Sequence, residues 1–239
     1  MISLENICKR FDDRMVLKGV SLSLARGEFS ILLGPSGAGK TLLLAILAGL
    51  EKPSSGRVLI GGCDMTSAPP ENRPVTMVFQ RHALFPNLTV FENIAFSMRA
   101  RRLPHRVVRS RVNELLALIN LPDYAHAKPD VLSGGQCQRV AVARALAADA
   151  EIILFDEPFS SLDRPLKAGL LSELKNIHRA APFTALYVTH DMDEARALGD
   201  RVHMIGNGRI TRSSAPHSLH DAAASVSGPL SALSPPPLF

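Results

Sequence analysis

Residues 34–41 read GPSGAGKT, and no other stretch restricts the interpretation of the chain as strongly. They fit the pattern G-x-x-x-x-G-K-[ST], in which glycines allow backbone N–H groups to converge on phosphate oxygens. In this pattern the lysine reaches the terminal phosphate and the hydroxyl ligates Mg²⁺. We therefore expect a nucleoside triphosphate, bound by Gly34, Pro35, Ser36, Gly37, Ala38, Gly39, Lys40 and Thr41.

The residues on either side of this loop fit the same interpretation. The apolar run SILL (30–33) precedes the loop, and LLLAILAGL (42–50) follows it. The second run is too apolar for a surface loop and too short to cross a membrane. The pattern predicts a strand, a phosphate-binding loop and a buried helix whose N-terminal N–H groups lie under the phosphates. The alternative is an ordinary glycine-rich turn with an exposed lysine.

The composition indicates a globular protein. With 239 residues, 46% of them hydrophobic, the chain can form one large domain or one domain with an inserted subdomain. No apolar run approaches the roughly 18–20 residues of a membrane-spanning helix, and the N-terminal MISLENICKRF lacks the apolar segment of a secretory signal. Three widely spaced cysteines fit neither a disulfide framework nor a metal site. We expect the chain to stay in the cytoplasm.

The net charge of +5 is concentrated in residues 99–111, which contain six arginines and no acidic residue. A solvated helix face, a contact with anionic lipid headgroups and a nucleic-acid site all fit such a stretch. Nucleic-acid sites usually interleave aromatic residues for stacking, and this stretch contains none. We therefore expect no nucleic-acid partner.

The hydrophobic pattern predicts an α/β fold with a mostly parallel sheet and an N-terminal antiparallel β layer. The first 30 residues alternate in hydrophobicity, as half-buried strands do. Two further strands are expected at 56–60 and 75–80. The apolar runs 151–155 and 184–189 do not alternate, which is typical of parallel strands covered on both faces. A hairpin is expected where residues 202–205 and 209–211 flank Gly206, Asn207 and Gly208.

A helical subdomain, inserted at about residues 85–145, is expected within a folded domain that covers residues 1–212. Val112, Leu115, Leu116 and Ile119 follow helical spacing, and Pro122 and Pro129 mark turns after them, all within residues 85–132. In residues 213–239, 17 of 27 residues are Ser, Ala or Pro. Because such a composition cannot bury enough apolar surface to offset its ordering entropy, we expect a flexible tail.

Polar residues follow three of the predicted core strands. Gln80, the pair Asp156 and Glu157, and His190 each stand where such a strand ends. The carboxyl ends of the strands are where open α/β sheets bind ligands, so these side chains are expected to converge on the nucleotide. One carboxylate suits the Mg²⁺ shell, the other suits the attacking water, and Gln and His suit the γ-phosphate. Taken alone, the acidic pair is equally compatible with a turn.

The second informative motif is LSGGQ, residues 132–136. Ser133 can cap a helix, and Gln136 completes an S-x-x-Q capping box. Taken alone, the motif is compatible with nothing more than a well-capped helix. However, two glycines beside a serine at a helix N-terminus also form an anion site. We therefore predict a second phosphate-binding segment at Ser133, Gly134, Gly135 and Gln136.

Residues 2–212 resemble the ATP-binding cassette ATPases, which are the nucleotide-binding subunits of ABC transporters. The motifs follow in that family's order: Phe11, residues 34–41, Gln80, residues 132–136, residues 152–157, residues 160–163 and His190. In the family an aromatic residue at the first position stacks on adenine. Phe11 is the candidate here, and Phe29 is the alternative.

The resemblance implies a head-to-tail homodimer, in which Ser133, Gly134, Gly135 and Gln136 of one subunit cap the ATP held by the phosphate loop of the other. It also implies that Glu157 is the general base and that His190, Gln80 and Lys40 are the other catalytic residues. By the same resemblance, Thr41, Gln80 and Asp156 hold Mg²⁺.

Residues 80–96 and 156–163 resemble cassettes of bacterial importers for polyamines, ferric iron, sulfate, thiamine or sugars. This likeness implies separate permease subunits, a solute-binding protein and a peripheral position on the cytoplasmic face of the inner membrane. One alternative is a non-transport ABC ATPase that acts in translation or DNA repair, although neither heptads nor a duplicated cassette is visible. Another is a protein that uses ATP binding only as a switch.

Overall fold

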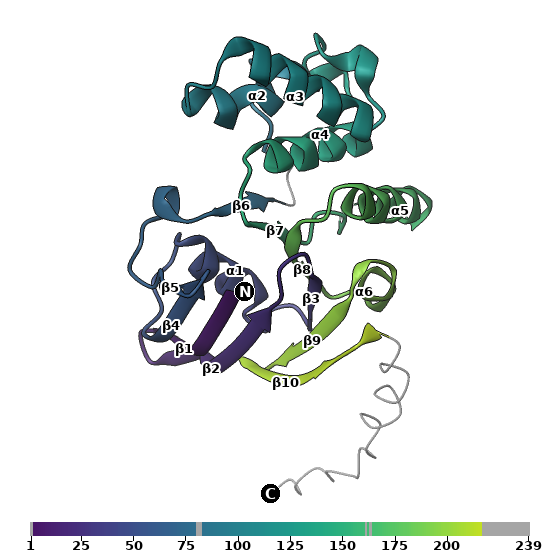
Figure 1. The fold of residues 1–239 in the computed structure, drawn as a ribbon. Helices are drawn as coiled ribbons and strands as arrows, with labels where there is room; N and C mark the ends of the chain where they lie inside the picture. Colours follow the sequence, from purple (N-terminus) through teal and green to yellow (C-terminus); the bar gives the residue numbers. More distant parts are fainter. Residues whose placement is uncertain (1, 80–82, 161, 163, 217–239) are drawn as a thin grey trace, which may run out of the picture.

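The computed structural model describes residues 2–79, 83–160, 162 and 164–216, which form two β-sheets and a helical unit (Figure 1). The first sheet has the strand order β2-β1-β4-β5, and all of its pairs are antiparallel. Its strands are β1 (Ile2–Phe11), β2 (Arg14–Leu24), β4 (Ser55–Ile60) and β5 (Cys63–Asp64). The predicted N-terminal antiparallel layer is confirmed, and the strand predicted at 56–60 belongs to it.

The second sheet has the strand order β10-β9-β3-β8-β7-β6. Every pair from β9 to β6 is parallel, and only β9 and β10 are antiparallel, so the predicted mostly parallel sheet is confirmed. Its strands are β3 (Phe29–Leu33), β6 (Val75–Val78), β7 (Ile152–Asp156), β8 (Thr184–Thr189), β9 (Arg201–Gly206) and β10 (Arg209–Ser214). The strand predicted at 75–80 ends at Val78, and Gln80 lies outside the described residues.

Two apolar clusters cover the two faces of the parallel sheet. On one face, Leu32, Leu154 and Val188 pack with α1 (Lys40–Ala48), and residues of β1 and β2 join this cluster. Helix α1 therefore lies between the two sheets (Figure 1). On the other face, Phe29 lies 6.0 Å from the Phe155 ring, centroid to centroid, among residues of α5 (Arg164–Ala180) and α6 (Met192–Leu198).

The helical unit comprises α2 (Val90–Ala100), α3 (His105–Leu118) and α4 (Gly134–Ala147), in the region where we predicted an insertion. The predicted apolar positions Val112, Leu115, Leu116 and Ile119 are all buried. A capping box between Thr89 and Glu92 begins α2. The structure has short 3₁₀ helices at η1 (Pro70–Asn72), η2 (Pro122–Tyr124) and η3 (Pro129–Val131), and the last two coincide with the turns predicted at Pro122 and Pro129. Among the described residues, no helix combines the length and the apolar character that crossing a bilayer requires.

The predicted C-terminal hairpin is confirmed, but it is longer than we expected. Strand β10 continues to Ser214, whereas the tail was predicted to begin at residue 213. Ser213 and Ser214 pair with His203 and Val202 of β9, and Ser213 Oγ lies 2.8 Å from His203 Nδ1. The composition could not reveal this polar partner, which helps to hold Ser213 in the sheet. Residues 217–239 lie outside the described part of the chain.

His203 makes the stability of the fold dependent on pH. Burial, together with the charge of Arg201, lowers the pKa of His203 from 6.5 to about 4, and the opposite effect of Glu28 is smaller. The unfolded chain therefore binds a proton below pH 6.5 that the folded chain does not bind. By linkage, the free energy of unfolding should fall by about 2 kcal/mol between pH 8 and pH 5, and the fall should end only below pH 4, where the folded chain binds the proton as well.

Urea unfolding of the wild type, His203→Gln and His126→Gln at pH 8 and pH 5 tests this expectation. His126 is exposed and serves as the matched control. His203→Gln should lose most of the pH dependence, and His126→Gln should keep it. An equal fall of stability in all three proteins would contradict the assignment to His203.

Candidate functional site

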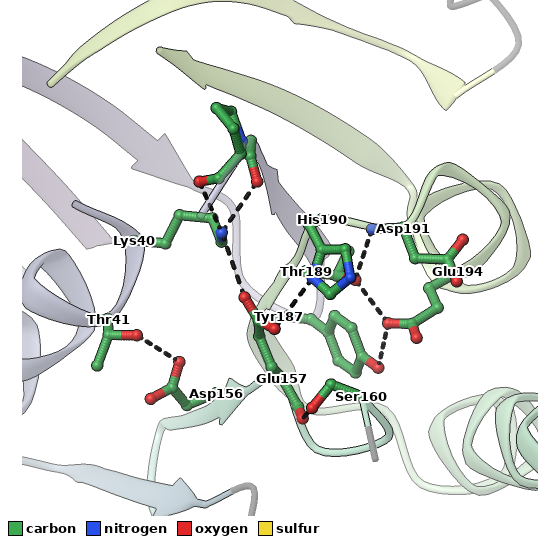
Figure 2. A network of polar contacts seen from close by, with 12 residues as sticks. Lys40, Thr41, Asp156, Glu157, Ser160, Tyr187, Thr189, His190, Asp191 and Glu194 are labelled. Carbon is green, nitrogen blue, oxygen red and sulfur yellow. Dashed lines mark hydrogen bonds and ion pairs between the residues drawn. The ribbon is translucent and has the colours of Figure 1, made fainter. Parts of the chain in front are cut away.

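The site lies where β3, β8 and β7, neighbouring parallel strands, end at the same edge of the sheet. β3 leads into residues 34–39, β7 ends at Asp156, and β8 is followed by His190. The side chains of Lys40, Asp156, Glu157 and His190 gather there (Figure 2). The structure thus brings together most of the polar residues that we expected to converge.

The phosphate loop has the backbone shape that its glycines permit. Gly37 and Gly39 have φ angles of 79° and 97°, in the left-handed region that other residues avoid. At Gly34, a Cβ atom would lie 2.3 Å from the carbonyl oxygen of Ile205, so no larger residue fits without displacement. Gly39 caps α1 without a side-chain hydrogen bond, which leaves the helix N-terminus open toward an anion.

Lys40 is almost fully buried, and its ammonium group has three acceptors. It donates to the carbonyl oxygens of Gly34 and Pro35 at 2.9 and 3.1 Å, and it lies 3.2 Å from Glu157 Oε1. The loop thereby holds the Lys40 ammonium against its own backbone, at Gly34 and Pro35. This is the position that the motif predicts for the group that contacts a terminal phosphate.

Glu157 lies between Lys40 and His190. Its Oε1 faces Lys40, and its Oε2 lies 3.0 Å from His190 Nδ1. The backbone at Glu157 has a φ angle of 44°, held by a hydrogen bond from its N–H to the Val188 carbonyl oxygen and by two from Ser160 to its own carbonyl oxygen. A non-glycine residue in this conformation is strained, and such strain clusters at functional sites.

Asp156 and Thr41 form the second polar contact of the site, because Thr41 Oγ1 donates to Asp156 Oδ1 at 3.0 Å. Burial raises the pKa of Asp156 above its ordinary value, Glu157 adds to this, and the contacts with Thr41 and Lys40 partly oppose it. A buried carboxylate in this state gains from a nearby cation.

The oxygen atoms of Thr41 and Asp156 suit a Mg²⁺ ion that is bound together with a nucleotide. Within the described ranges, no three His, Cys, Asp or Glu side chains form a metal cluster. Mg²⁺ is usually held by one or two protein oxygens together with substrate phosphates and water, and Thr41 and Asp156 supply such oxygens. The third expected ligand, Gln80, lies outside the described residues, so its place in the site stays a prediction.

A cavity of about 420 Å³ lies over the loop. It is lined by Val16, Ser36, Gly37, Gly39, Lys40, Thr41, Leu42, Asp156 and Glu157. Larger cavities lie beside α3 and between the helical unit and the sheets, and they contain none of these polar groups. The chemistry of the lining, rather than the size of the cavity, therefore identifies the site.

The LSGGQ motif, residues 132–136, which we call the signature segment, lies at the start of α4 as the sequence predicts. Ser133 Oγ accepts from the Gln136 N–H at 3.3 Å, and Gln136 Oε1 accepts from the Ser133 N–H at 2.8 Å, which confirms the capping box. Ser133 and Gly134 are exposed, whereas Gly135 is buried beside α5. The segment belongs to the helical unit, while the phosphate loop belongs to the sheet region (Figure 1). The serine end of this helix is therefore open to solvent.

The two aromatic candidates for adenine differ sharply in exposure. Phe29 is fully buried and packs on Phe155, so it is a core residue. Phe11 ends β1 with 46% of its surface exposed, and the Lys9 ammonium lies 4.9 Å from its ring centroid. Phe11 thus has the accessible ring that stacking requires, and its contact with adenine stays a prediction. Of residues 160–163, 161 and 163 lie outside the described part of the chain.

Sequence reasoning missed a polar network beside His190 that is centred on the buried Glu194. It consists of Lys167 together with Tyr187, Thr189, Asp191 and Glu194, and Figure 2 shows the last four. A D-x-x-E pattern over residues 191–194 is recognisable as a helix start, and Asp191 does cap α6. The inward course of the Glu194 side chain, however, depends on tertiary partners from β8 and α5, which no local pattern indicates.

The strand order and the loop together define a P-loop nucleotide-binding fold. The family model described as ABC transporter matches residues 17–160, and the chain belongs to this family. The chain is also similar to solved cassettes. A dimeric, post-hydrolysis structure of the ATP-binding cassette MJ0796 with ADP and Pi shares 34% identity at a TM-score of 0.75, covering 90% of this chain and 99% of that one. cbiO1 from Clostridium perfringens shares 26% identity at a TM-score of 0.85, covering 93% and 91%.

Curated relatives include import proteins. The spermidine/putrescine import ATP-binding protein PotA of Thermotoga maritima is 48% identical over 94% of this chain and 61% of its own length. The Fe(3+) ions import ATP-binding protein FbpC of Rhizobium etli is 44% identical over 94% of this chain and 64% of its own length. The chain thus spans less than two thirds of the length of these relatives.

Proposed function

We propose that this chain is the ATP-hydrolysing subunit of a bacterial ABC importer, in which it drives solute uptake through separate permease subunits. The observation that carries the proposal is the contact of Glu157 with both Lys40 and His190 beside an open phosphate loop. A carboxylate between a lysine and a histidine at the edge of a parallel sheet has the position that a base needs beside a terminal phosphate.

The named relatives support the import function without defining the solute. PotA is named for spermidine and putrescine, and FbpC for ferric ions, yet this chain is similar to both at comparable identity. The permease, a solute-binding protein and a peripheral position on the cytoplasmic face of the inner membrane are parts of the same proposal. The non-transport alternative finds no relative among these names.

The chain's own groups account for binding and for the proton transfer. Backbone N–H groups of residues 34–39 and the Lys40 ammonium bind the phosphates. When a phosphate takes the place of Glu157 beside Lys40, the carboxylate is released to orient a water molecule and to accept its proton. His190 then contacts the γ-phosphate. Bound Mg²⁺, held by Thr41, Asp156 and Gln80, supplies neutralisation of the phosphate charge.

The signature segment supports a dimer with shared sites. Ser133 and Gly134 are exposed at a helix N-terminus, in a different layer of the molecule from the phosphate loop (Figure 1). A second copy, placed head to tail, brings this helix end to the γ-phosphate of its partner. Ser133, Gly134, Gly135 and Gln136 thus act in trans. The dimeric state of the MJ0796 cassette is in line with this arrangement.

Replacing the proposed base gives the first test. Glu157→Gln keeps the size of the side chain but cannot accept the proton, so turnover should fall by about 10² to 10⁴. Affinity for ATP should be retained, because Lys40 and the loop remain. The measurements are phosphate release and nucleotide binding, with Glu114→Gln on the exposed face of α3 as the matched control. Equal turnover in both variants would remove Glu157 from its role.

Blocking the signature segment tests the shared site. Ser133→Arg places a bulky cation at the exposed helix end, so ATP-driven dimerisation should be lost while the monomer stays folded. Light scattering with ATP in the Glu157→Gln background measures the dimer. Ser110→Arg adds the same charge on the exposed surface of α3 and should leave dimerisation intact. Dimers of the Ser133→Arg variant would refute the arrangement in trans.

The import assignment is tested by the partners of the native complex. Purification of the tagged chain from detergent-solubilised membranes should recover two membrane-spanning subunits, and solute should stimulate ATP hydrolysis in the reconstituted complex. Recovery with ribosomes or DNA-repair proteins, and none with membrane proteins, would favour the non-transport class.

A further inference from the structure

Glu194 is an almost fully buried carboxylate that the catalytic scheme does not use. It lies in α6, behind the strand that ends before His190 (Figure 2). Its Oε2 accepts two hydrogen bonds, from Tyr187 OH at 2.9 Å and from Thr189 Oγ1 at 2.7 Å. Its Oε1 lies 2.8 Å from Lys167 Nζ of α5. With this many partners, the buried Glu194 carboxylate is held rigidly in one position.

Thr189, which precedes His190, links Glu194 to Asp191, which follows His190. The Thr189 hydroxyl, which donates to Glu194, also accepts from the Asp191 N–H at 3.0 Å. The Thr189 carbonyl oxygen accepts from the Gly34 N–H at 3.3 Å. The residues immediately before and after His190 are therefore held by one hydroxyl, and the orientation of that hydroxyl is set by Glu194.

We propose that Glu194, paired with Lys167, is a positioning residue that fixes the backbone of His190 for ATP hydrolysis. The inference rests on the proposed function, in which His190 contacts the γ-phosphate. Glu194 reaches no reacting atom in this scheme. It acts through Thr189, and its loss should affect the rate of the chemical step more than the affinity for ATP.

The chemistry of the network requires a carboxylate at this position. The hydroxyls of Tyr187 and Thr189 donate to one carboxylate oxygen of Glu194, and the other oxygen faces the Lys167 ammonium. These three polar partners of the carboxylate are all donors. Burial and the Glu194 charge raise the pKa of Tyr187 well above its ordinary value, which keeps its hydroxyl a donor. Burial lowers the pKa of Lys167, but Glu194 and Asp191 outweigh it, so the pKa lies above its usual value.

The contact with Lys167 also joins His190 to α5. This helix begins at Arg164, soon after Glu157 and the segment that follows it. Lys167 binds Asp191 at 3.1 Å as well as Glu194, so it holds the residue that follows His190 from a second direction. A displacement of the start of α5 is thereby passed to the His190 backbone through two ion pairs.

The test compares two lysines of the same helix. Lys175 donates to the Leu198 carbonyl oxygen and to Asp200, and so joins α5 to the end of α6 without touching the His190 segment. Glu194→Gln should lower kcat for ATP hydrolysis about tenfold with KM for ATP changed less than about twofold. Lys167→Gln should lower kcat in the same direction, and Lys175→Gln should leave it within about twofold of the wild type.

Hydrogen exchange gives a readout that does not depend on hydrolysis. The amide of Asp191 should exchange about tenfold faster in Glu194→Gln than in Lys175→Gln, because an amide has one acceptor oxygen and cannot satisfy both the two hydroxyls and the Lys167 ammonium, so the Thr189 hydroxyl is held less firmly. If Glu194→Gln does not fold, Thr189→Val and the double variant Lys167→Gln with Glu194→Gln serve the same comparison. Thr189→Val removes the intermediate hydroxyl and should reproduce both effects.

The outcomes separate this inference from the proposed function. Unchanged exchange at Asp191, or a kcat of Glu194→Gln equal to that of Lys175→Gln in a hydrolysing protein, overturns the positioning role. Equal and negligible hydrolysis by the wild type and Glu157→Gln overturns the proposed function instead. In that case the exchange experiment alone decides whether Glu194 fixes the His190 segment.

Discussion

The site depends on the register of the parallel strands β3, β8 and β7. This register is fixed because both faces of the sheet are buried. The rings of Phe29, Phe155 and Tyr187 all lie on one face, whereas aliphatic side chains face α1 on the other. A slip of one residue would move an aromatic ring into the space where the leucines of α1 pack, and would break the core on both sides. The strand ends therefore meet at one edge, and the polar residues that follow them come together.

At that edge, the groups proposed for phosphate binding contact the groups proposed for catalysis. Lys40 is held by two carbonyl oxygens of the loop and by Glu157, while Glu157 is shared with His190. A phosphate that binds Lys40 competes directly with the proposed base. In the proposed mechanism, nucleotide binding therefore releases the Glu157 carboxylate, and the proposed role of Glu194 is to hold the His190 backbone beside it.

Much of this arrangement could be predicted, because its signals are local in the sequence. The spacing of the glycines predicted the phosphate loop, and the unbroken apolar runs predicted the parallel strands. The S-x-x-Q pattern predicted the start of α4. The Glu194 network and the length of β10 were not predictable. Tyr187 and Thr189 lie within an apolar run, and Ser213 lies in a serine-rich stretch, so each acquires its polar role only from partners distant in the chain. The place of Gln80 and the ligand contact of Phe11 remain predictions.

The hairpin of β9 and β10 packs tightly against β2 beside the nucleotide cavity. The Gly208 carbonyl oxygen accepts from the Lys18 N–H at 2.8 Å, and a Cβ atom at Gly208 would lie 2.0 Å from the carbonyl oxygen of Val16. Val16 lines the cavity over the phosphate loop. The turn of this hairpin therefore packs directly on the backbone at the rim of the cavity, and any residue larger than glycine at position 208 would displace Val16 from that rim.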